Sequence, residues 1–330
     1  MEIATRRRIK TTMVYDAYWS FACERMSIYH KRIEGYKSPW TEDEILRKHK
    51  FTNAYRVIDR VSQYLVREII LPDEKNGTDL YDKIFRILLF KTFNKIETWK
   101  LLKDHINDLS WHNYNFEIFN KVLSQAMSSN QPIYSAAYIM ASGKRNFGHE
   151  KKHENHLKLL EFMMKDRFVE KIIDCNKMEN LFDLLMSYPT IGDFLAYQYA
   201  TDINYSSVTN FSEMEFVKAG PGAIDGIRKC FTSTGGYTNE DIIRYMAEQQ
   251  EFEFERLGLI FSSLYNRKLM LIDCQNLFCE IGKYARVAYP DYIGTSNRKK
   301  IKQLYKTSHD LELPCFPTKW NIRMPMKDRR

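Results

Sequence analysis

Apolar residues recur every three or four positions over most of this 330-residue chain. That spacing places them on one face of an α-helix. Runs of this kind cover residues 51–65, 84–102, 116–127, 157–168, 178–186 and 240–257. Strand signals are few, and 13 glycines with 9 prolines are too few for a turn-dense all-β fold. The sequence therefore predicts a mainly α-helical fold with few or no strands.

The chain shows no internal repeat, no linker-like tract and no low-complexity segment. We therefore expect a single helical domain over residues 1–330, with a basic extension at each end. No segment has the roughly 18 uncharged apolar residues that cross a bilayer, and the arginines at 6–8 are not followed by an apolar stretch. Six scattered cysteines form no Cys-x-x-Cys pair. These features predict a soluble, cytoplasmic protein.

Both ends of the chain are basic, although its middle is acidic. The formal net charge is +8; residues 1–70 hold 14 Lys and Arg against 9 Asp and Glu, and residues 281–330 hold 12 against 4. Lys and Arg neutralise phosphates whatever the base sequence, so this distribution suits double-stranded DNA. An ordinary solvated basic surface explains the charge equally well. We expect no membrane, no obligate protein partner and no cofactor.

Three histidines, His149, His153 and His156, have the spacing of metal ligands on a helix. Lysines and an arginine flank them, and no second ligand cluster lies nearby in the sequence. This favours a solvated helix that faces nucleic acid over a metal site, and we predict no bound metal.

A turn sequence lies between two helical patterns. Pro189 ends the first, and Gly192 permits a tight turn where the second begins. Free N–H groups at a helix N-terminus bind phosphate without a basic side chain. The sequence therefore predicts a helix-hairpin-helix at about 178–200 whose tip, with Thr190 and Gly192, faces DNA phosphate. An ordinary helix-to-helix turn is the alternative.

The pattern Pro-x-apolar-Gly-x-x-x-Ala at 189–196 resembles the hairpin of the helix-hairpin-helix DNA glycosylase superfamily. There an acid follows the hairpin glycine by about twenty residues, and Glu213 lies 21 residues after Gly192. Bifunctional members carry a lysine nucleophile where this chain has Phe194, so the resemblance implies a monofunctional enzyme. The usual Asp is replaced by Glu, and Glu215 stays an alternative to Glu213.

A second resemblance covers nearly the whole chain. It rests on the blocks FTNAYRVIDRVSQYL (51–65), LLFKTFNKIETW (88–99), PIYSAAYIM (132–140), FSEMEFVKAGPGAIDGIRKCF (211–231) and LIDCQNLFCEIGKYARV (271–287). They are similar to a helical, glycosylase-related family of α-glutamyl/putrescinyl thymine pyrophosphorylases, which includes the helical domain attached to hydroxymethyluracil DNA kinases. The resemblance implies a hypermodified pyrimidine in phage DNA as the substrate. No Gly-x-x-x-x-Gly-Lys-Ser/Thr sequence occurs, so we expect no kinase half and no phosphoryl transfer from ATP.

Breaking an N-glycosidic bond builds positive charge on the deoxyribose, which a carboxylate stabilises. Glu213 and Glu215 are the candidate catalytic residues. A flipped base needs aromatic walls and polar groups that read its edge. The candidates for substrate binding are Asn53, Gln63, Tyr134, Tyr138, Asp273, Gln275 and Asn276. Core packing is the alternative for the tyrosines, and helix capping or a buried polar network is the alternative for the residues at 273–276.

Several residues, most of them basic, are candidates for phosphate contact. They are Arg56, Arg60, Lys91, Lys95, Thr190, Gly192 and Arg228. The arginines at 56 and 60 lie opposite the apolar face of the helix predicted at 51–65. A solvated surface is an equally good interpretation of the lysines and Arg228.

These observations predict a monofunctional DNA glycosylase, a hydrolase that flips and excises a hypermodified pyrimidine and leaves an abasic site, as an antiviral defence against phage. One alternative is a transferase that displaces pyrophosphate on a modified thymine with an amine or amino acid. Another is a noncatalytic module that binds modified DNA and recruits a partner.

Overall fold

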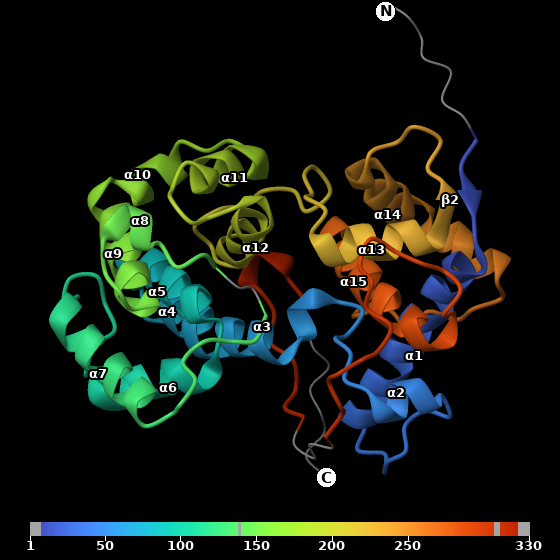
Figure 1. The fold of residues 1–330 in the computed structure, drawn as a ribbon, viewed down its shortest axis with the longest axis horizontal. Coiled ribbons are helices and arrows are strands. Elements are labelled where there is room, and N and C mark those ends of the chain that lie inside the picture. The colour runs from blue at the N-terminus through green and yellow to red at the C-terminus, as the bar shows by residue number, and fades with distance from the viewer. Residues whose placement is uncertain (1–7, 138–139, 307–310, 323–330) are drawn as a thin grey trace, which may run out of the picture. The chain divides into compact units, whose positions relative to one another are not determined.

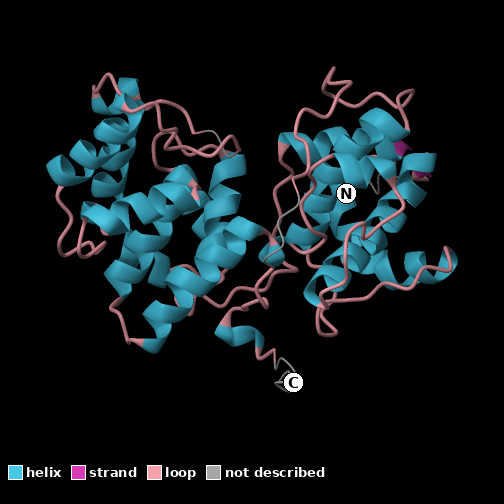
Figure 2. Cartoon of the chain, turned by 90° about the horizontal axis from the view of Figure 1, so that it is seen from below, coloured by secondary structure: helices cyan, strands magenta, loops and turns pink. Residues whose placement is uncertain are grey.

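A computed structural model describes residues 8–137, 140–306 and 311–322. The described chain is helical apart from two short paired strands, which confirms the predicted mainly α-helical fold (Figures 1 and 2). Two compact units form, and each takes two stretches of sequence. Unit 1 comprises Met1–Asp59 and Glu213–Pro314, and unit 2 comprises Arg60–Ser212 and Cys315–Arg330. The single domain expected from the sequence stays a prediction.

Unit 1 is built around the crossing of two helices. Its elements are β1 (Lys10–Thr11), α1 (Met13–Ile33), α2 (Glu44–Lys48), the 3-10 helix η1 (Arg56–Ile58), α13 (Pro221–Cys230), β2 (Phe231–Ser233), α14 (Asn239–Arg256) and α15 (Leu271–Ala288). A Cβ on Gly226 of α13 would lie 2.0 Å from the carbonyl oxygen of Phe278 on α15. Only glycine allows α13 and α15 to pack this closely.

Helix α1 is held at its start and buried along one side. Thr12 caps it by accepting a hydrogen bond of 3.1 Å from the N–H of Val14. Tyr18 and Trp19 are fully buried, and the Tyr18 ring lies 4.8 Å from that of Phe278 on α15. Strand β1 precedes α1 and pairs antiparallel with β2. These contacts fix α1 in the core of unit 1.

Unit 2 contains the remaining helices. They are α3 (Arg60–Leu65), the π-helix η2 (Val66–Ile70), α4 (Leu71–Lys75), α5 (Leu80–Phe93), α6 (Ile96–His105), α7 (Phe116–Ser128), α8 (Lys144–Phe147), α9 (Lys152–Lys165), α10 (Phe168–Ile173), α11 (Met178–Met186), α12 (Asp193–Ile203) and the 3-10 helix η3 (Thr318–Trp320). The segment around Cys315 joins this unit because its backbone forms two hydrogen bonds, of 2.8 and 2.9 Å, with the Gln63 amide.

The prediction of a helix at 51–65 is largely wrong. Residues 51–55 form a loop, and regular α-helix begins only at Arg60. The N–H groups of Thr52, Asn53 and Arg56 donate to carboxylates rather than to helical carbonyls, at 2.9, 2.8 and 2.8 Å. Amphipathic spacing is therefore present, but side chains elsewhere in unit 1 take the hydrogen bonds that a helix would need.

The solvated helix predicted around the three histidines is also wrong. His153 and His156 on α9 are 0% exposed. The His156 ring bonds the Tyr134 hydroxyl at 2.8 Å and the Ala141 carbonyl at 2.7 Å. His153 lies 2.9 Å from Asn120 on α7. Both side chains are enclosed by unit 2, and they hold α9 against neighbouring segments.

Candidate functional site

Two of the sequence blocks singled out above meet inside unit 1. The loop at 51–59 lies against α15, and polar side chains join the two. Asn276 donates to the Thr52 hydroxyl at 3.1 Å and to the Asn53 carbonyl at 3.2 Å. Glu280 accepts from the Thr52 N–H at 2.9 Å. The structure thus brings together Asn53 and Asn276, which are 223 residues apart.

Asp273 lies at the centre of this arrangement. One carboxylate oxygen accepts from the Arg56 N–H at 2.8 Å, and the other accepts from the Met270 N–H at 2.9 Å, which closes a capping box at the start of α15. The side chain is buried, and burial raises the pKa of Asp273 to about 6 against the pull of those two hydrogen bonds. The contacts of Asp273 thus fit helix capping and a buried polar network, the alternative to substrate binding given above.

A second carboxyl, which is partly buried, lies at the end of the loop. Asp59 accepts from the Asn53 N–H, and burial raises its pKa to about 7. Arg25 reaches the loop from α1, donating to the Thr52 carbonyl at 2.9 Å and to the Asn53 side chain at 3.0 Å. Burial lowers the pKa of Arg25. The loop is therefore held by charged groups as well as by its buried apolar side chains, such as Ala54 and Val57.

The candidate catalytic residue Glu213 joins the same region. Its carboxylate forms an ion pair with the guanidinium of Arg267, and each side chain is 14% exposed. The Tyr55 hydroxyl donates to the Arg267 carbonyl, and the negative charge of Glu213 adds to the rise in the pKa of Asp273. We call Glu213, Arg267, Asp273 and Arg56 the Asp273 cluster. Sequence reasoning missed Arg267, because nothing in its local pattern indicates a partner 54 residues away.

Other candidates in unit 1 lie outside this cluster. Glu215 is exposed, and its backbone carbonyl accepts a hydrogen bond of 2.7 Å from Arg244. Gln275 is 2% exposed and lies 3.6 Å from the Cys279 sulfur. Arg228 is exposed on α13 and forms no ion pair with the described residues. Of these, Arg228 is placed to meet a ligand from solvent.

The candidate phosphate contacts differ widely in exposure. Arg56 is 4% exposed. Lys91 is fully enclosed in unit 2, where its ammonium lies 2.9 Å from Asp202. Arg60 is 69% exposed and Lys95 is 20% exposed at the side chain, and both face Glu97, at 3.5 and 3.9 Å. In this structure Arg60 is open to a phosphate, whereas Lys91 and Arg56 are not.

The predicted hairpin region consists of α11, a turn and α12. Gly192 precedes α12 with no side-chain cap, and a Cβ there would meet nothing within 4 Å. Thr190 in the turn has φ +69°, which is rare for a β-branched residue, and its hydroxyl has no partner among the described residues. Gly192 therefore offers no side chain to the first turn of α12.

Two other candidates in unit 2 serve structural contacts, and one is not described. Tyr134 bonds His156, and its ring lies 5.1 Å from that of Phe93. Gln63 pairs with the backbone of Cys315. Tyr138 lies outside the described residues. Core packing, the alternative for the tyrosines, fits Tyr134.

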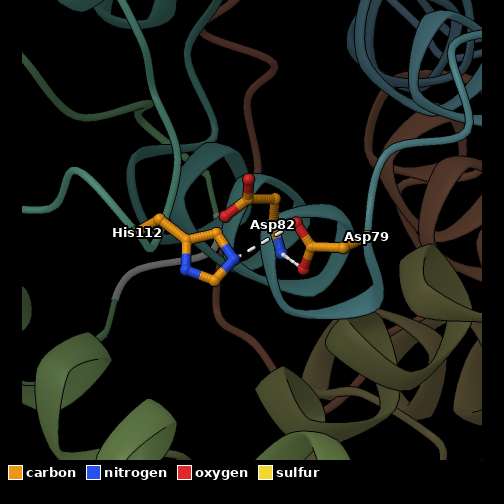
Figure 3. Close-up of side chains that lie close together, drawn as sticks. All are labelled: Asp79, Asp82 and His112. Atoms are coloured by element: carbon orange, nitrogen blue, oxygen red, sulfur yellow. Dashed lines mark hydrogen bonds and ion pairs between the residues drawn. The ribbon is translucent and has the colours of Figure 1, made fainter.

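A group of possible metal ligands occurs at the start of α5. Atoms of Asp79, Asp82 and His112 lie within 4.8 Å of one another (Figure 3). Asp79 caps α5, His112 lies 3.3 Å from it, and Asp82 accepts from the Trp111 N–H at 2.8 Å. These bonds hold the loop at 111–112 to α5, and the positive end of the α5 dipole opposes a cation there.

Comparison with known proteins identifies the family. Residues 12–294 match the family described as 5-hmdU DNA kinase, helical domain. The chain belongs to this family. It is 25% identical over 288 residues to a 5-hmdU DNA kinase of Bacillus phage SP10, an alignment that covers 82% of this chain and 45% of the phage protein. The chain therefore spans about half the length of that relative. No solved structure matches.

The family corrects the predicted activity. Both the family and the phage relative are described as DNA kinases, which transfer phosphate, so the prediction of an N-glycosylase and hydrolase is wrong. Neither the pyrophosphate-displacing transferase nor the recruiting module matches that description either. A short hairpin pattern with an acid 21 residues later was too weak a basis for the chemistry. The expected link to DNA agrees with the family, as does the expected link to phage. Among the described residues, no helix is both long and apolar enough to cross a membrane.

Proposed function

We propose that this chain is the DNA-binding helical part of a 5-hmdU DNA kinase. It binds duplex DNA that carries 5-hydroxymethyldeoxyuridine and holds it for phosphorylation. The observation that carries the proposal is the match of residues 12–294 to the helical domain of that family. Since no Gly-x-x-x-x-Gly-Lys-Ser/Thr motif occurs, we assign to this chain the binding of DNA rather than of the nucleoside triphosphate.

The phosphate contacts that we propose are the candidates open to solvent. Arg228 and Arg60 supply exposed guanidinium groups, and the uncapped start of α12 at Gly192 supplies backbone N–H groups. Lysines and arginines in the basic ends add nonspecific attraction. These contacts read no base sequence, so they position the duplex without selecting a base.

Selection of the modified base is assigned to Glu213 in the Asp273 cluster. The 5-hydroxymethyl group differs from a thymine methyl by one hydroxyl, which donates a hydrogen bond to a carboxylate. Glu213 is partly exposed, and Arg267 holds its charge in place. A site built to bond a hydroxyl discriminates against a ligand that lacks it, because the polar group is then left unpaired.

Fluorescence anisotropy with two matched duplexes tests this proposal. One contains 5-hmdU and the other thymidine at the same positions. We expect Arg228→Gln to weaken both complexes equally and to reduce the log–log salt slope by about 0.9, the value for one phosphate. Lys268→Gln is the control, because Lys268 is exposed but already pairs with Glu251 at 2.9 Å.

The same assay separates base selection from backbone binding. Glu213→Gln should lower the preference for 5-hmdU over thymidine while leaving the salt slope unchanged. Glu215→Gln is its control, because that exposed carboxylate lies two residues away and outside the cluster. Equal affinity of the unaltered chain for both duplexes would refute base selection, and no duplex binding at moderate salt would refute the proposed function.

A further inference from the structure

Unit 1 carries a long groove beside α1. Its volume is about 710 Å³, and its lining residues on α1 run from Met13 to Lys31. The 18 residue steps between them span about 27 Å at 1.5 Å per residue. Trp40 and the segment that follows it form another part of the wall, and Tyr284 of α15 lines it as well. The groove is therefore elongated rather than compact.

The groove is acidic in a chain that is basic overall. Asp16, Glu24, Glu42 and Asp43 line it, against the single cation Lys31. Glu24 forms no ion pair or hydrogen bond with the described residues, and the Glu42 side chain is 96% exposed with only a 4.0 Å contact to Arg47. Glu24 thus lacks a neutralising partner among those residues and Glu42 has only a long, exposed one, so this surface repels DNA phosphate.

Cations of the chain itself already contact groups that line the groove. Arg256 pairs with the carboxylate of Asp16. The Arg32 guanidinium lies 5.1 Å from the centre of the Trp40 ring, and the Lys31 ammonium donates to the Trp40 carbonyl at 3.0 Å. Carboxylates and aromatic rings together are the usual surroundings of ammonium and guanidinium groups.

We propose that this groove binds an extended, basic segment of a partner polypeptide, whose Lys or Arg side chains reach Glu24 and Glu42. A strand rises about 3.3 Å per residue, so 27 Å accommodates about eight residues. This inference does not depend on the proposed binding of 5-hmdU DNA.

The test uses a fluorescein-labelled eight-residue peptide in which lysine alternates with leucine, titrated with the full chain. A peptide with glutamate in place of each lysine is the ligand control. We expect saturable, salt-sensitive binding of the basic peptide alone. The double variant Glu24→Gln and Glu42→Gln should weaken it about 2- to 30-fold, the range for two exposed ion pairs. Glu248→Gln, an exposed carboxylate on α14 outside the groove, should have no effect.

Circular dichroism checks that the double variant and the Glu248→Gln control are folded. We expect that they are, because Glu24, Glu42 and Glu248 are not buried. Absence of saturable binding would overturn the proposal. So would binding that the double variant Glu24→Gln and Glu42→Gln leaves unchanged. A four-residue peptide or spermidine that binds as tightly as the eight-residue peptide would make this a small-cation site instead. Concentration-dependent self-association that the double variant abolishes would identify a second copy of the chain as the occupant.

Discussion

The buried ion pair between Lys91 and Asp202 offers a sharp test of how unit 2 is built. The two side chains are 2% and 4% exposed, and the charged atoms are 2.9 Å apart. Lys91→Met removes one charge and leaves the Asp202 carboxylate buried without its counter-ion. Breaking a buried pair in this way costs about 3–5 kcal/mol, which is a large part of the 5–15 kcal/mol that holds a typical domain folded.

Urea denaturation followed by circular dichroism measures that loss, and Lys95→Met is the matched control. Lys95 lies four residues further on, beyond the end of α5 and just before α6, and its ammonium is 3.9 Å from Glu97 in a more exposed pair, so we expect a cost below about 1 kcal/mol. Folded Lys91→Met protein should bind DNA with unchanged salt dependence. The reasoning fails if Lys91→Met is as stable as the unaltered chain and its salt slope falls by about one phosphate, because Lys91 would then contact DNA.

Three further results are expected. Burial lowers the pKa of His156 to about 4, below the 6.5 of the unfolded chain. The neutral ring therefore stabilises the fold fully above pH 6.5, and about 3 kcal/mol of the free energy of unfolding is lost as the pH falls from 6.5 to 4. NMR titration of the ring checks the pKa, and the urea midpoint of His156→Gln should depend less on pH over that interval. Gly226→Ala places a Cβ 2.0 Å from the Phe278 carbonyl oxygen and should destabilise unit 1 by at least 1–3 kcal/mol in the same measurement, whereas Gly192→Ala, in open space, should not. Asp82→Ala leaves the Trp111 N–H without its acceptor and should increase amide exchange in the loop at 111–112, while Asp183→Ala, at an exposed position of α11, should leave that exchange unchanged.

The helices that sequence periodicity predicted best are those that bury an apolar face within their own unit. At 116–127 and 178–186, α7 and α11 begin and end within a residue or two of the predicted bounds. Their apolar residues, such as Leu123 and Leu185, are fully buried. Periodicity succeeds there because burial of that face is the main force that decides the local structure.

The loop at 51–59 has the same apolar spacing and does not form an α-helix. Three of its backbone N–H groups donate hydrogen bonds to the carboxylates of Asp59, Glu280 and Asp273. Two of these carboxylates lie more than 200 residues away along the sequence. No local pattern reveals such partners. The same limit applied to Lys91, for which the sequence left phosphate contact and a solvated surface open; the structure buries this lysine beside Asp202, which neither interpretation anticipated.

The residues of the candidate site were also predicted only in part from the sequence. The sequence blocks at 51–65 and 271–287 were singled out because of a resemblance, and the structure shows why residues in both are needed together: Asp273 caps α15 with one oxygen and holds the loop with the other. That double role explains the polar residue types without any reference to a ligand. A function for the Asp273 cluster must therefore depend on the groups that still reach solvent. Glu213 and Arg267 are the pair that does so, which is why the substitution of Glu213, rather than of Asp273, discriminates between binding of the modified base and maintenance of the fold.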